Sequence, residues 1–189
     1  MRSSTLALQD MCAREPNVVK ALVEAENLAT RNVQRWVRLS AEEILDFPVL
    51  TFEYLQNLTN GVYQVKLAPS YIQDKQRDED EELDIEMLRD RNRLPEPGFL
   101  RARVFSRFRN AAKHQLWIAY QSTNEDENDQ ENEDPIQGYY CTCKSGARTV
   151  GTCAHIASII WFMGYARHQP NIHYPSNQII ESIRDSANR

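Results

Sequence analysis

Four side chains in the last third of the chain have the types and the spacing of a metal site. Cys141 and Cys143 are separated by one residue, as are Cys153 and His155, and nine residues lie between the pairs. Three thiolates and one imidazole form a ligand set that binds Zn²⁺ tetrahedrally. The pattern therefore predicts one structural Zn²⁺ ion held by these four side chains. A thiol-redox site is not favoured, because the chain contains no C-x-x-C.

The elements around the ligands must bring the two pairs to one ion. Residues 137–141 are predicted to form a strand. Residues 154–167 are predicted to form a helix that is apolar on nearly every side, which is typical of a buried or interface helix. Gly146 and Gly151 allow the intervening loop to fold back. Cys153 would then lie at the start of the helix, where amide dipoles favour a thiolate.

The same ligand set argues against catalysis. Four protein ligands leave no open position on the metal for water or substrate. No nucleophile with an adjacent base, phosphate-binding glycine loop or nucleotide-binding motif is visible. We therefore expect that the protein is not an enzyme and has no small-molecule substrate. The other histidines considered as spare ligands are expected in turns or at the surface: His114, His168 and His173.

The spacing C-x-C-x9-C-x-H between a strand and a helix resembles the SWIM-type zinc finger, a ββα arrangement with the signature C-x-C-xn-C-x-H. Residues 57–68, 116–120, 138–151 and 154–158 together resemble SWIM-domain proteins that are encoded by, or derived from, eukaryotic DNA transposons. The resemblance covers about residues 45–168. It implies zinc binding, interaction with DNA or protein, and a nuclear location. The acidic insertion before Cys141 departs from the family pattern.

Charge is distributed unevenly along the chain. The net charge of −5 over 189 residues argues, taken alone, against a nucleic-acid-binding protein. Residues 124–134 hold seven acidic residues and no basic one, which predicts a solvated loop. Without this loop, residues 99–180 carry a charge of +8 and no acidic residue. The overall charge therefore hides a basic module.

The basic residues of this module form a candidate phosphate-binding surface. Residues 99–109 alternate, with Leu100, Ala102 and Val104 on one face of a predicted strand and the arginines on the other. Arginines on one strand face can follow a phosphate backbone. The alternative is a solvated sheet face that pairs with the acidic loop. The candidate nucleic-acid-binding residues are Arg101, Arg103, Arg107, Arg109, Lys144 and Arg148.

The chain as a whole is predicted to be an α+β protein. A helical N-terminal region (1–70) and an acidic, proline-rich linker (71–98) precede a SWIM-type zinc-binding module (99–168) and a tail (169–189). The module is expected to be a small antiparallel β-sheet, with strands at 99–109 and 115–120, whose zinc knuckle leads into a C-terminal helix. Within the first region, helices are predicted at 16–38, after Ser40 and after Thr51; residues 62–68 fit strand or helix.

Two functions fit these features. The first is a zinc-dependent module that binds DNA or another nucleic acid. The second is a protein-interaction adaptor with a purely structural zinc, which uses the apolar helix at 156–165. No stretch approaches the ~18 apolar residues needed to cross a bilayer, so no membrane role is expected. An intracellular location is expected, because the N-terminus lacks the apolar run of a secretory signal.

Overall fold

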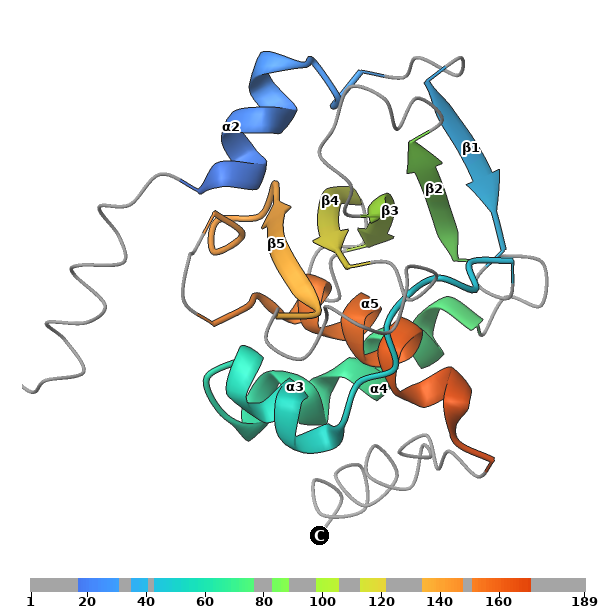
Figure 1. Ribbon diagram of the computed structural model, residues 1–189. Coiled ribbons are helices and arrows are strands. Elements are labelled where there is room, and N and C mark those ends of the chain that lie inside the picture. The colour runs from blue at the N-terminus through green and yellow to red at the C-terminus, as the bar shows by residue number, and fades with distance from the viewer. Residues whose placement is uncertain are drawn as a thin grey trace, which may run out of the picture.

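A five-stranded antiparallel sheet with helices on both faces forms the protein (Figure 1). In the computed structural model, residues 17–30, 35–40, 43–76, 83–88, 98–105, 113–121, 134–147 and 151–170 are described. The strands follow the order β1-β2-β3-β4-β5, which confirms the expected α+β class. The elements are α2 (Val18–Ala25), β1 (Trp36–Leu39), α3 (Phe52–Leu58), α4 (Val62–Gln76), β2 (Asp84–Leu88), β3 (Gly98–Phe105), β4 (Lys113–Tyr120), β5 (Ile136–Cys141), α5 (Ala154–Gly164) and the 3₁₀ turn η2 (Ala166–His168).

The hairpin of β3 and β4 is the centre of the sheet. Its register runs without a break from Gly98 opposite Tyr120 to Phe105 opposite Lys113. A Cβ atom at Gly98 would overlap the Tyr120 ring, so only glycine fits there. On the other side of β4, Leu116 lies opposite Cys141, the last residue of β5. This register fixes where the first metal ligand leaves the sheet.

The alternation along β3 separates two hydrophobic clusters, one on each face of the sheet. Leu100, Ala102 and Val104 face the larger cluster, which lies under α4 and α5, as the sequence predicts. That cluster joins side chains from residues 44–72 to side chains from 85–166 in one core. On the opposite face, Phe99 packs with residues of α2 and β4 in the smaller cluster. Burial of apolar surface thus stabilises the sheet on both sides.

The helix predicted over 16–38 is wrong beyond its first turns. Helix α2 begins after Asn17, whose side chain accepts a hydrogen bond from the Lys20 amide. It ends where Asn27 adopts a left-handed conformation, with φ 52°, and the Leu28 amide bonds to the Val23 carbonyl. This is the geometry of a helix C-cap, and asparagine tolerates it better than most residues. After the cap the chain forms the edge strand β1 instead of more helix.

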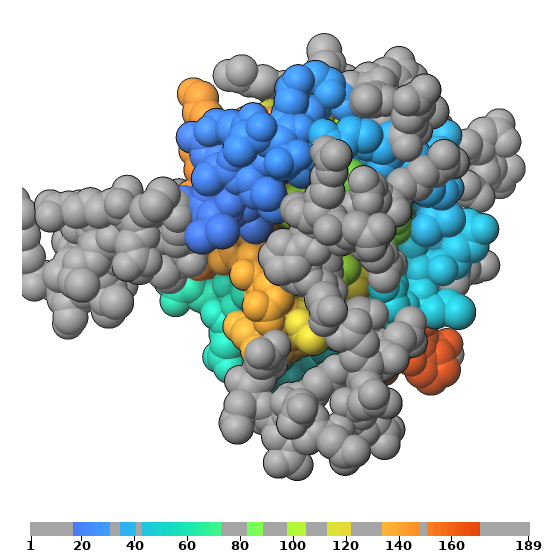
Figure 2. All heavy atoms as spheres, turned by 45° about the horizontal axis from the view of Figure 1, so that its top comes forward, coloured from blue at the N-terminus to red at the C-terminus, as the bar shows by residue number. Residues whose placement is uncertain are grey.

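Helix α2 is tied to the sheet by its N-cap residue as well as by its apolar face. Figure 2 shows α2, in blue, lying directly against β5, in orange. The Asn17 amide group donates a hydrogen bond of 2.9 Å to the carbonyl of Tyr139 in β5. Val19 and Val23 of the helix are buried in the smaller cluster. Helix α2 therefore covers the face of the sheet that carries the smaller cluster.

The segment between α2 and α4 confirms some predicted elements and not others. The Ser40 amide donates to the Glu43 carboxylate, as in a capping box, but residues 43–50 are not helical. The helix predicted after Thr51 is confirmed as α3, with the Thr51 hydroxyl as its N-cap. A turn at Asn60 and Gly61, both with positive φ, leads into α4. Residues 62–68, left open between strand and helix, are helical.

A linker is the wrong description of part of residues 71–98. Tyr71 and Ile72 belong to helix α4 and are buried in the larger cluster. Asp84–Leu88 forms strand β2, which pairs with β1 on one side and β3 on the other. The sequence obscures this strand because acidic residues flank it, although Ile85 and Met87 point into the core. The sequence does not predict this strand, because the many charged residues around it are typical of a solvated linker and its apolar alternation is short.

Helix α5 is confirmed and is buried rather than exposed. Ile156, Ile159 and Ile160 have no exposed surface. Its N-terminal residues face the end of β5, and Gly164 near its C-terminus packs closely on Leu50. The apolar side chains of this helix are therefore occupied by the core. No helix among the described residues combines the length and the apolar character that a membrane span requires.

Candidate metal centre

The first two ligands come from a tight turn at the end of β5. Cys141 is the last residue of the strand, and Cys143 lies in the turn that follows. The Cys141 amide donates to the Gly146 carbonyl, and the Gly146 amide donates to the Cys143 carbonyl, each at 2.9 Å. These two bonds fold the chain back on itself. Both thiols can therefore face the same point, which two residues of a flat strand could not do.

Glycine and the neighbouring strand hold this turn in shape. A Cβ atom at Gly146 would overlap the carbonyl of Cys141, so a larger residue cannot be placed without moving the ligand. The Thr142 amide donates to the Gln115 carbonyl, and the Gln115 amide donates to the Thr142 hydroxyl. These two hydrogen bonds attach the turn to strand β4. We call residues 141–147 the knuckle.

The other two ligands lie at the start of α5. Cys153 is the N-cap residue of the helix, and its carbonyl accepts a bond from the Ala157 amide. His155 is the second helical residue and is 8% exposed. Gly151, with φ 67°, takes a left-handed conformation shortly before the helix, which glycine adopts without strain. The described parts of the loop between the ligand pairs, residues 144–147 and 151–152, therefore place glycine where the sequence indicates that it is needed.

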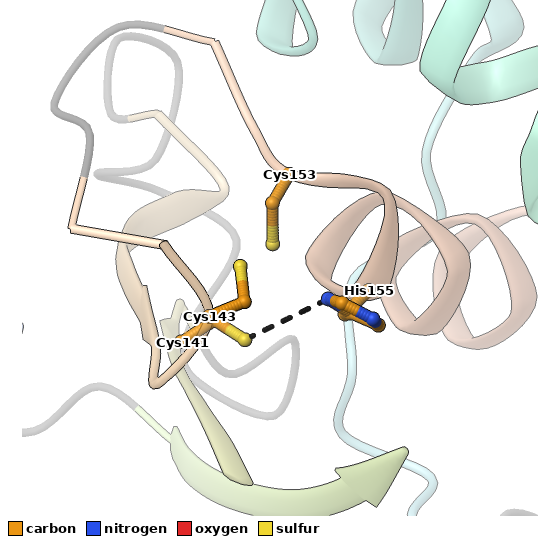
Figure 3. A group of neighbouring side chains, drawn as sticks. All are labelled: Cys141, Cys143, Cys153 and His155. Atoms are coloured by element: carbon orange, nitrogen blue, oxygen red, sulfur yellow. Dashed lines mark hydrogen bonds between the residues drawn. The ribbon is translucent and has the colours of Figure 1, made fainter. Parts of the chain in front are cut away.

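The four side chains converge on one point, as Figure 3 shows. The ligand atoms of Cys141, Cys143, Cys153 and His155 all lie within 4.8 Å of one another. The Cys141 Sγ atom is 4.0 Å from the His155 Nδ1 atom. Ligands about 2.3 Å from a tetrahedral zinc are ~3.8 Å apart. The group is therefore close to the size that one metal ion needs, and it can hold one.

The three thiols shift one another's pKa values, and these shifts are compatible with a cation between them. Thiol hydrogen bonds from Cys141 and Cys153 lower the pKa of Cys143 far below its usual range. Hydrogen bonds to Cys143 and Cys153, together with burial, raise the pKa of Cys141 far above it. For Cys153 a hydrogen bond with Cys141 lowers the pKa, but the Cys143 bond and burial outweigh it and raise the pKa to about 11. The three thiols therefore do not all lose their protons readily side by side, whereas a divalent ion would stabilise all three as thiolates.

Two aromatic side chains outside the four predicted ligands contact the His155 ring. The His114 ring centroid is 4.7 Å from that of His155, and the Tyr71 ring meets His155 edge-on at 5.4 Å. His114 lies in strand β4 and is half-buried, so its predicted placement in a turn or at the surface is wrong. Burial, and then the charge of His155, lower its pKa. Only the packing of α5 against β4 would have indicated this position.

The candidate arginines of β3 do not form an open surface. Arg101 is 1% exposed and donates to the Glu86 carboxylate through Nε at 2.6 Å. Its Nη1 donates to the carbonyls of Leu28 and Thr30, and its guanidinium lies 4.1 Å above the Trp36 ring.

The second described arginine of this strand is also paired. Arg103 contacts the carboxylates of Asp84 at 3.1 Å and Glu86 at 3.3 Å. Lys144 is exposed in the knuckle. Arg107, Arg109 and Arg148 lie outside the described residues, as does all of the predicted acidic loop except Asp134. The structure therefore places Lys144 near the metal ligands and places Arg101 and Arg103 against acidic partners from β2.

Comparison with known proteins adds no relative. Searches of protein-family models, of curated proteins and of solved structures found no match to this chain. The resemblance to SWIM-type zinc fingers therefore stays a prediction from the sequence.

Proposed function

We propose that this chain is a SWIM-type zinc-binding module in which one Zn²⁺ ion is structural and takes no part in catalysis. The convergence of four ligand atoms within 4.8 Å is the observation that supports it. Three thiolates with one imidazole are a ligand set that structural zinc sites use, and softer ligands disfavour Mg²⁺ and Ca²⁺. Because all four positions are filled by protein, the ion has no place for a substrate or an activated water.

The zinc would join two elements that share few other local contacts. The knuckle extends from β5, whereas Cys153 and His155 begin α5, and residues 148–150 between them are not described. Metal binding would fix the start of the helix against the end of the strand. Because the unfolded chain has no preformed site, the free energy of metal binding is added to the stability of the folded state.

Metal content and thermal unfolding test this proposal. We expect one zinc per chain in protein purified without added metal, measured by inductively coupled plasma mass spectrometry. Cys143→Ser and His155→Ala should lose the metal and unfold at lower temperature. His168→Ala is the matched control, because this histidine is exposed and outside the ligand group. Full zinc content and unchanged thermal stability in both ligand variants would contradict the proposal.

A nucleic-acid partner is the second candidate, and the exposed Lys144 beside the metal ligands is the observation that favours it. We propose that DNA would contact the knuckle rather than the centre of β3, because Arg101 and Arg103 are already paired. Titration of the zinc-loaded protein with a short fluorescent duplex, at low and at moderate salt, tests this. Saturable binding that weakens steeply with salt and falls in Lys144→Ala would support it. Absence of binding at low salt would favour the protein-interaction adaptor.

A further inference from the structure

The orientation of the His155 ring is the feature of the metal centre that ordinary ligand chemistry does not explain. A histidine that binds a metal through one ring nitrogen usually donates its other N–H to a carboxylate, a carbonyl or water. Here the Nε2 atom of His155 is buried and has no hydrogen-bond partner among the described residues. Within the described part of the chain, no protein group therefore supplies the bond that commonly fixes the ring of a zinc ligand.

Aromatic contacts take its place. The His114 ring, on β4, lies 4.7 Å from the His155 ring at an angle of 47°. The Tyr71 ring, on α4, meets the His155 ring edge-on, at 82°. Tyr71 is 7% exposed and His155 is 8% exposed, so the ring has little room to turn. Two elements far apart in the sequence thus restrict one ligand.

The direction of the ring decides which nitrogen can reach the ion. The Nδ1 atom of His155 lies 4.0 Å from the Cys141 Sγ atom. In Figure 3 this nitrogen points toward the sulfur atoms, and the other ring nitrogen points away from them. To present Nε2 to the sulfur atoms instead, the whole side chain would have to move past its aromatic neighbours.

From these contacts we infer that His114 and Tyr71 are positioning residues that hold His155 so that Nδ1, and not Nε2, binds the metal. This inference rests on the proposed function, because it requires that the four ligands bind zinc. It assigns a role in metal affinity to two side chains outside the C-x-C-x9-C-x-H pattern. Loss of an outer group that orients a ligand typically weakens metal binding 10–100-fold.

Nuclear magnetic resonance of the unsubstituted protein gives the first test. Long-range ¹H–¹⁵N spectra of the zinc-loaded, ¹⁵N-labelled chain distinguish a metal-bound Nδ1 with a protonated Nε2 from the reverse arrangement. We expect the former for His155. Zinc bound through Nε2 would overturn the inference while leaving the proposed zinc site intact. Failure of the parent protein to bind zinc at all would instead contradict the proposed function.

Variants at His114 give the second test, measured as zinc affinity by competition with a chromophoric chelator. His114→Ala should bind zinc about 10–100-fold more weakly, whereas His114→Phe, which keeps a ring, should recover most of the affinity. The Co²⁺-substituted His114→Ala protein should also show altered visible bands, which report ligand geometry rather than stability. His168→Ala should match the parent in both measurements. Parent-like affinity and spectra in a folded His114→Ala would refute a positioning role.

Discussion

Arg101 offers the sharpest test of how the structure reassigns a residue. The sequence makes it a candidate phosphate contact, whereas the structure buries it between the sheet and the turn after α2. We consider Arg101→Met, which removes the charge and keeps a long apolar side chain beside Trp36. The expected result is a loss of folding stability, with no direct effect on the four candidate metal ligands.

The size of this loss follows from the contacts. Arg101 Nε and Nη2 lie 2.6 Å and 2.5 Å from Glu86 Oε2, and the Glu86 side chain is 16% exposed. Removing one partner of a buried ion pair costs about 3–5 kcal/mol, since it leaves the other charge without compensation. Arg103 remains 3.3 Å from the same carboxylate, which keeps part of that compensation. We therefore expect the lower end, about 3 kcal/mol.

Urea unfolding of the zinc-loaded protein, followed by circular dichroism, measures this difference. Lys20→Ala is the control for an ion pair at the surface, because the Lys20 and Glu24 side chains are 43% and 65% exposed, and it should cost only about 0.3–0.5 kcal/mol. The double variant Arg101→Met, Glu86→Leu should regain much of the lost stability, because an apolar pair can replace a buried ion pair.

A role of Arg101 in nucleic-acid binding predicts the opposite result. The free energy of unfolding of Arg101→Met would then lie within about 1 kcal/mol of that of the parent, and the variant would lose affinity for a duplex. That combination would refute the burial argument and restore the function expected from the sequence. A loss of stability with no gain in the double variant would show that packing, and not charge, is the main contribution of this side chain.

Three further predictions follow from single contacts. Gly146→Ala should weaken zinc binding in a chelator competition, because the new Cβ would overlap the Cys141 carbonyl. Thr51→Ala should lower stability in urea by about 1 kcal/mol through loss of the α3 cap. Burial and the hydrogen bond to Asp134 raise the pKa of Tyr54, so above about pH 10 the unfolded chain loses this proton first and stability falls. Tyr54→Phe should reduce that fall when urea unfolding is compared at about pH 8 and pH 10.5.

The four candidate metal ligands could be found from the sequence because the information is local. Spacing alone places Cys141 near Cys143 and Cys153 near His155, and a strand followed by a helix needs only a flexible loop to join the pairs. Helices α3 and α5 were also predictable, since a capping threonine and a continuous apolar run act within a few residues of themselves. Short-range signals of this kind can be interpreted without knowledge of the fold.

Whether the arginines of β3 are exposed or paired depends instead on strand register. The alternation of β3 correctly places Arg101 on the face opposite the larger core, and nothing nearby in the sequence shows what covers that face. Pairing of β2 with β3 sets Glu86 opposite Arg101, and the turn after α2 brings the carbonyl of Leu28 to the same guanidinium. The strand β2 that supplies the acid was itself hidden in a charged segment.

The chain by itself therefore determines which side chains can bind a metal, and the tertiary structure decides what holds them and which charges remain exposed. His114 shows the difference: its sequence neighbours give no sign of a role, but the packing of α5 against β4 brings its ring against His155. The physical reason is that ligand type and spacing are properties of a short segment. Burial, ion pairing and ring contacts arise only when segments distant in sequence pack together.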